Sequence, residues 1–172
     1  MRTALALVMA LAVVEVAGAE TGSPTGSRVR ASSPAVAAAI TAATEQSSTF
    51  RGLLDAINAT DGIVYLEEGR CGHGVRSCLA AVMDAGANRV VRIRIGKYSS
   101  ALSMMTAIGH ELRHALEVLS NPDIRSTEAM QQFYLRNGSR GPGGAMETYA
   151  ALVAGDSVRA ELQGHQKERT AR

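Results

Sequence analysis

The sequence has few aromatic residues and few cysteines. Aromatic side chains make up 3% of its 172 residues, there is no tryptophan, and there are two cysteines. The length is enough for one domain and short for two. With 46% hydrophobic residues the chain can bury an ordinary core, which must be built from alanine, valine, leucine, isoleucine and methionine.

The chain also has no cluster of basic residues. The formal net charge is +2, and all but two of the 18 basic residues are arginines scattered along the sequence. Nucleic-acid and membrane-surface binders carry clustered lysine and arginine. We therefore expect no nucleic-acid partner. After the N-terminal region, no segment is long and apolar enough to span a bilayer.

The N-terminus has the three parts of an export signal. A short positive start, Met1-Arg2, precedes the apolar run Ala4–Val14, and Ala17-Gly18-Ala19 forms a small-residue cleavage site. An uncleaved membrane anchor is the alternative, but the apolar run is shorter than a span requires. We expect residues 1–19 to be removed, leaving a secreted or periplasmic protein with no stable membrane span.

The two cysteines bracket a short, glycine-containing segment. Cys71 and Cys78 are separated by six residues, and Gly72 and Gly74 make a turn possible. In an exported chain this arrangement predicts a disulfide that closes a small loop. A pair of free thiols is an alternative. A metal site that uses His73 is another, although no fourth ligand is evident.

Hydrophobic periodicity predicts an α+β fold in which a small, mostly antiparallel sheet packs on helices. A hairpin should join the first two strands, with the disulfide at its tip, and residues 84–88 form a turn. We expect a lead-in without structure over residues 20–33, a single domain over 34–164 and a polar tail over 165–172. The predicted helices cover residues 34–44, 48–57, 99–119, 126–135 and 145–162, and the predicted strands cover 63–66, 78–83 and 90–95.

The strongest chemical signal is His110-Glu111-Leu112-Arg113-His114, within the predicted helix 99–119. Two of the chain's four histidines lie one helical turn apart, so both imidazoles can bind one Zn²⁺ ion. Glu111, next to the first histidine, is placed to polarise a zinc-bound water. The opposite side of the helix is apolar, carrying Ala101, Met104, Met105, Ile108, Leu112, Ala115, Leu116 and Leu119.

A catalytic zinc site needs a third protein ligand. Glu147, in the predicted last helix, is the first choice, because nearby small residues (Ala150, Ala151 and Ala154) would let that helix approach the histidines closely. Glu117 is the second choice. It lies on the same helix edge as both histidines and is better suited to support the site, for instance by an ion pair with Arg113.

This pattern resembles the gluzincin branch of the zincin metallopeptidases. There an HExxH helix provides two zinc ligands and a glutamate on a later helix provides the third; here Glu147 in Met146-Glu147-Thr148-Tyr149-Ala150 matches it. The metzincin branch fits badly, since it requires Gly at the position of Glu117 and His at that of Ser120. The resemblance covers the C-terminal half of the chain.

The resemblance implies a zincin-like fold and a secreted zinc-dependent peptidase that acts on a peptide or protein substrate. Glu111 would take a proton from zinc-bound water and pass it to the leaving amine. The strand at 90–95 would pair with an extended substrate. The oxyanion would be stabilised by His73, Tyr134, Tyr149, His165 or an arginine, among which the sequence does not choose.

Two other interpretations remain open. The chain has little room for the second domain that completes the cleft in larger zincins, so an exported, non-catalytic domain that binds zinc or a partner is an alternative. A chance arrangement of two histidines on a helix surface is the other.

Overall fold

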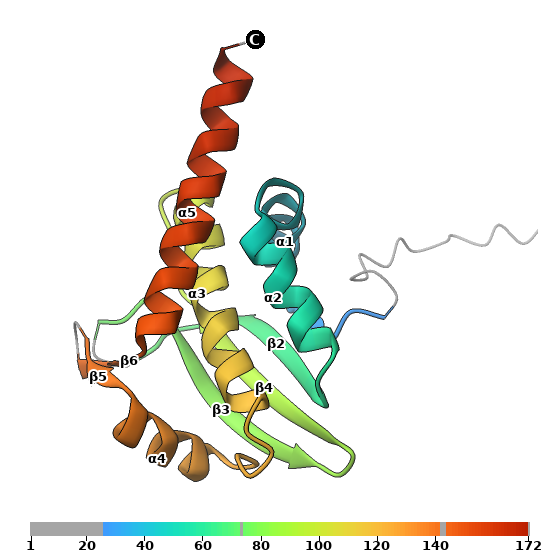
Figure 1. The fold of residues 1–172 in the computed structure, drawn as a ribbon, viewed down its shortest axis with the longest axis vertical. Helices are drawn as coiled ribbons and strands as arrows, with labels where there is room; N and C mark the ends of the chain where they lie inside the picture. The colour runs from blue at the N-terminus through green and yellow to red at the C-terminus, as the bar shows by residue number, and fades with distance from the viewer. Residues whose placement is uncertain (1–25, 73, 142–143, 172) are drawn as a thin grey trace, which may run out of the picture.

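The computed structural model describes residues 26–72, 74–141 and 144–171, so the predicted export signal lies outside the described residues. The fold is α+β, with helices packed on a small sheet (Figure 1). In the described residues, no helix is long and apolar enough to cross a membrane. The elements in chain order are β1 (Val29–Ala31), α1 (Pro34–Gln46), α2 (Ser48–Asn58), β2 (Gly62–Glu68), β3 (Ser77–Ala85), β4 (Asn88–Ile95), α3 (Ala101–Leu119), α4 (Thr127–Asn137), β5 (Ser139–Arg140), β6 (Met146–Glu147) and α5 (Tyr149–Thr170).

The main sheet is mixed, and the predicted mostly antiparallel sheet is wrong. Its strand order is β1-β2-β4-β3, in which β1–β2 and β2–β4 are parallel and only β3–β4 is antiparallel. The predicted hairpin between β2 and β3 is also wrong, because β4 lies between them. β3 and β4 form the hairpin instead, because the tight turn at Gly86-Ala87 joins them. β2 then pairs with the other edge of β4.

Strand β4 has the alternation that the sequence predicted. Val91, Ile93 and Ile95 are buried, whereas Arg92 and Arg94 are exposed. Because β4 is paired on both sides, it has no free edge for a substrate, contrary to the expectation from the zincin resemblance. The free edge nearest the motif helix belongs to β3.

Both ends of the domain differ from the predicted boundaries. Residues 29–31, within the expected unstructured lead-in, form β1 and pair with β2. Val29 is 3% exposed, but one buried apolar residue among polar neighbours gives no periodic signal. At the other end, α5 continues to Thr170, through most of the predicted polar tail.

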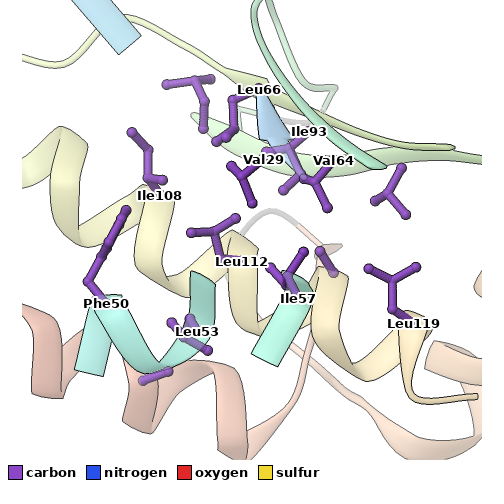
Figure 2. Close-up of a cluster of buried hydrophobic side chains, with 14 of the residues drawn as sticks. Val29, Phe50, Leu53, Ile57, Val64, Leu66, Ile93, Ile108, Leu112 and Leu119 are labelled. Carbon is purple, nitrogen blue, oxygen red and sulfur yellow. The ribbon is translucent and has the colours of Figure 1, made fainter. Parts of the chain in front are cut away.

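The core lies between the sheet and the helices that cover one of its faces (Figure 2). Ile108 and Leu112 of α3 point toward Leu66 and Ile93 of the sheet. Phe50, from α2, packs from the side of α3 away from the sheet. Helix α3 is therefore packed on both sides. This packing fixes the orientation of its polar side, which carries His110 and His114.

Buried Arg89 of β4 fixes the C-terminal end of α3. Its guanidinium pairs with Asp61 at 2.6 Å and donates to the carbonyls of Val118 and Leu119 at 3.1 and 2.7 Å. The last carbonyls of a helix have no partner within the helix and carry partial negative charge. Arg89 thus anchors α3 to the sheet by satisfying them.

Candidate metal centre

Helix α3 presents both motif histidines on one face. Their ring centroids are 4.8 Å apart, as expected for residues four positions apart on a helix. His114 is 5% exposed and Glu111 is 4% exposed, whereas the side chain of His110 is more accessible. The helix begins at the N-cap Ser100, whose hydroxyl accepts a hydrogen bond from the Ser103 amide.

Glu147 reaches the histidines from β6 and not from the last helix. Helix α5 begins at Tyr149 with Thr148 as its N-cap, so the predicted helix start at residue 145 is wrong. Residues 146–147 instead pair with β5, with Ser139 opposite Glu147. This short hairpin directs the Glu147 side chain at the α3 face.

The structure brings the three predicted ligands together. Oε2 of Glu147 lies 2.9 Å from Nε2 of His110 and 3.3 Å from Nε2 of His114. All three ligand atoms lie within 4.8 Å of one another. With metal–ligand bonds of about 2.0–2.1 Å, neighbouring ligands of tetrahedral zinc are about 3.3–3.4 Å apart. The donor set and spacing therefore fit a metal ion such as Zn²⁺.

Glu117, the second choice as a ligand, does not belong to this group. Its Oε2 accepts a hydrogen bond from Nδ1 of His114 at 3.1 Å, and its Oε1 accepts one from the Thr148 hydroxyl at 2.7 Å. Arg113 lies 3.6 Å from the same carboxylate. Glu117 therefore orients His114 with its Nε2 toward Glu147, the usual role of a carboxylate behind a ligating histidine.

Thr148 is a site residue that sequence reasoning missed. Besides donating to Glu117, its side chain accepts the Ala151 amide at the start of α5. The Thr148 hydroxyl thus links the start of α5 to the Glu117 carboxylate, which is hydrogen-bonded to His114. A threonine before a helix predicts a cap, but nothing in the sequence shows that it reaches Glu117.

Hydrogen bonds between the imidazoles and the carboxylates shift the pKa values of His114 and Glu147. Burial lowers the pKa of His114, but hydrogen bonds to Glu117 and Glu147 outweigh it and raise the pKa to about 9. Burial raises the pKa of Glu147, but hydrogen bonds from His110 and His114 outweigh it and lower the pKa to about 2. Glu147 is therefore ionised at neutral pH, as a metal ligand must be, whereas His114 would release a proton on binding a metal ion.

The motif carboxylate Glu111 has a different environment. It is buried, which raises its pKa, and the nearby imidazoles only partly offset this. Its Oε1 accepts a hydrogen bond of 2.8 Å from the hydroxyl of Ser77, the first residue of β3. Ser77 is a second residue that sequence reasoning missed, because a lone serine beside a cysteine loop carries no pattern.

Among the described residues, Tyr134 is the aromatic candidate for oxyanion stabilisation that lines the cavity beside these ligands. Its hydroxyl donates to the main-chain carbonyl of His114 at 2.9 Å and lies 3.4 Å from Glu117. Tyr149 is 83% exposed, and His165 lies near the far end of α5. His73 falls outside the described residues.

A cavity of about 610 Å³ opens beside Glu111, His114 and Glu147. The disulfide Cys71–Cys78 forms part of its wall, which confirms the predicted pairing and excludes both free thiols and a cysteine-ligated metal at this position. Most of the wall is apolar, with side chains from the disulfide loop, β3, α4 and β6. These side chains are Val75, Leu79, Ala80, Met130, Leu135 and Met146.

The predicted close approach of the last helix to α3 is confirmed, and Gly155 makes it possible beside His110. A Cβ atom at Gly155 would lie 3.2 Å from Cβ of His110 and 3.5 Å from its Nδ1. Ala151 and Ala154 on the same helix are buried, whereas Ala150 is only partly so.

Comparison with known proteins gives no match: no family model, no curated protein and no solved structure is significantly similar to this chain.

Proposed function

We propose that this protein is a zinc-dependent peptidase of the gluzincin type. The observation that carries the proposal is the convergence of His110, His114 and Glu147, with buried Glu111 beside them, at the edge of a cavity. Two imidazoles and one carboxylate are the ligand set of catalytic zinc in several peptidases, and a position remains for water or substrate.

Zinc bound by these residues would supply Lewis acidity, polarising the scissile carbonyl and acidifying a water molecule. The proton transfers fall to Glu111. Its raised pKa suits a group that accepts a proton from the attacking water and then donates it to the leaving amine. The hydrogen bond from Ser77 holds one carboxylate oxygen and leaves the other for these transfers.

The substrate binding site is expected between β3 and α4. β3 is the edge strand of the main sheet, and its residues Cys78, Leu79 and Ala80 line the cavity. An extended peptide can add to such an edge through main-chain hydrogen bonds. The apolar cavity wall would then receive one of its side chains, which favours a substrate with a bulky apolar residue.

An oxidising compartment fits the disulfide Cys71–Cys78, because such bonds persist in secreted and periplasmic proteins. Together with the export signal proposed for residues 1–19, it supports a secreted or periplasmic location. Measuring the N-terminus of the exported protein by mass spectrometry tests this location; an intact Met1 would contradict cleavage after residue 19.

The second candidate function is an exported, non-catalytic zinc-binding or partner-binding domain. One observation favours it: the hydroxyl of Tyr134 is already engaged with the His114 carbonyl. The tyrosine candidate for oxyanion stabilisation is therefore already engaged in this arrangement, which leaves Arg94 as the arginine candidate in the cavity wall. A fourth coordination position closed by a protein group, as in structural zinc sites, would support this function.

Glu111→Gln separates the two functions. The variant should keep the zinc content of the wild type, because Glu111 is not among the three ligands, while hydrolysis of an unfolded protein substrate falls by about 100-fold or more. Glu128→Gln, on the surface of α4, is the matched control. Hydrolysis retained in Glu111→Gln would contradict the mechanism, and zinc binding without hydrolysis in the wild type would favour the non-catalytic domain.

A further inference from the structure

The edge strand β3 is closed at one end by the segment that leads into α4. The Thr127 hydroxyl accepts the Val82 amide at 3.1 Å and donates to the Val82 carbonyl at 3.2 Å. Both main-chain groups of Val82 on the outer edge of β3 are therefore occupied by a side chain of the neighbouring element. No further strand can pair with β3 at this position while Thr127 is in place.

A second anchor reinforces the closure two residues further along β3. Arg125 forms a bidentate pair with Asp84, at 2.7 and 2.9 Å, and also donates to the Gly86 carbonyl at 2.8 Å. The pairs at Val82 and Asp84 hold residues 125–127 against the outer edge of β3.

The other half of this edge is open. Within the described ranges, no other element forms a main-chain hydrogen bond with the outer edge of β3 between Ser77 and Ala81. Ser77 itself contacts Glu111, so the open stretch begins at the proposed catalytic carboxylate and ends at Val82. A β-bulge between Leu79 and Ala81 lies within this stretch, so its length matches the five β4 residues from Ile95 to Val91. Four steps of about 3.3 Å span roughly 13 Å, the length of a five-residue strand.

We propose that residues 125–127 form a stop that limits the site to a short peptide segment, of about five residues, on one side of the bond to be cleaved. This inference rests on the proposed function for the position of the scissile bond. The cavity of about 610 Å³ agrees with it, since its volume lies in the range of pockets that enclose a small ligand.

The direction of the substrate follows from strand pairing. β3 runs from Ser77, beside Glu111, toward the stop at Val82. An antiparallel partner, the more stable arrangement, runs from the stop toward Glu111. The stop therefore faces the residues on the N-terminal side of the scissile bond, and the ligand class is a peptide whose chain ends or turns away on that side.

The test measures peptide binding to zinc-loaded Glu111→Gln protein by fluorescence anisotropy. The probe is a blocked peptide of about five extended residues with a single leucine. Two longer versions carry a stiff proline-rich extension, which cannot fold back, at the N-terminus or at the C-terminus. We expect the N-terminal extension to weaken binding at least tenfold and the C-terminal extension to change it less than twofold.

Equal binding of the N-terminally extended peptide would overturn the stop, and so would a failure of the short probe to bind. The double variant Arg125→Ala/Thr127→Ala, made in the Glu111→Gln background, should regain most of the tenfold loss. Thr44→Ala is its matched control, because that hydroxyl bonds only the Ile40 carbonyl within α1. Hydrolysis of the short probe by wild-type protein is measured separately, so an absent peptidase activity would leave the length-dependent binding as evidence for the stop.

Discussion

At the scale of single residues, the centre depends on contacts behind the ligands as much as on the ligands. Glu117 orients His114, Ser77 holds Glu111, and Thr148 joins Glu117 to the start of α5. Helical spacing predicted that His110 and His114 lie on one face of the helix, because residues four positions apart are neighbours on a helix surface. Ser77 and Thr148 were not predictable, because their partners lie far away in sequence and only the folded chain brings them close.

Gly155→Ala tests how closely α5 must approach His110. The added methyl group would lie 3.2 Å from the His110 Cβ, so α3 and α5 must move apart by a few tenths of an ångström beside the ligand. We expect zinc affinity to fall about tenfold, measured by competition with a chelator, which corresponds to about 1.4 kcal/mol of binding free energy.

Gly164→Ala is the matched control, because it lies on the same helix and its added Cβ would meet nothing within 4 Å. Both substitutions raise helix propensity equally, so only the contact with His110 differs. Equal zinc affinity in the two variants would contradict the role assigned to Gly155.

At the scale of elements, the sequence predicted the helices better than the sheet. The ranges of α1 to α4 lie within two residues of those predicted. Helix α1 is rich in alanine, the other three have apolar residues at helical spacing, and each of the four begins at a serine N-cap. Strand order depends on long-range pairing that a local pattern does not encode, so the position of β4 between β2 and β3 was missed. Glu147 was expected in a helix for the same reason, since β6 exists only through its pairing with β5.

Glu161 joins α5 to the start of α2. Its carboxylate accepts hydrogen bonds from the hydroxyls of Ser47, Ser48 and Thr49 and from the Thr49 amide. Burial raises the pKa of Glu161, but these hydrogen bonds outweigh it and lower the pKa to about 2. A carboxylate at a helix N-terminus is also favoured by the helix dipole.

Glu161→Gln should therefore lower the free energy of unfolding by about 2 kcal/mol at neutral pH. Because the pKa is lower in the folded protein, the contribution of Glu161 is fully present above its ordinary pKa of 4.5 and is lost as the pH falls toward about 2. Urea unfolding at several pH values should show the two proteins converging over that range. A constant difference down to pH 2 would contradict the assignment.

At the scale of the whole molecule, the metal centre and the cavity are built from different parts of the chain. The candidate ligands come from α3 and β6, whereas the disulfide loop, β3 and α4 supply most of the cavity wall. A change in the wall should therefore affect substrate binding without removing zinc.

Replacing both cysteines with alanine tests this separation. Loss of a cross-link that closes so short a loop should lower the free energy of unfolding by about 2–3 kcal/mol. We expect zinc content to stay at the wild-type value while binding of the leucine-containing probe weakens at least threefold. Loss of zinc from this variant would show that the wall and the metal centre are not independent.

The zinc content per chain decides whether His110, His114 and Glu147 form a metal site. It is measured on the wild type, Glu147→Ala and Glu168→Ala, all purified without added zinc. Glu168 is an exposed glutamate near the end of α5 and serves as the control. We expect one zinc in the wild type and in Glu168→Ala, and a large loss in Glu147→Ala, because a three-ligand site is left with two histidines. Undiminished zinc in Glu147→Ala, or none in the wild type, would contradict the three-ligand site.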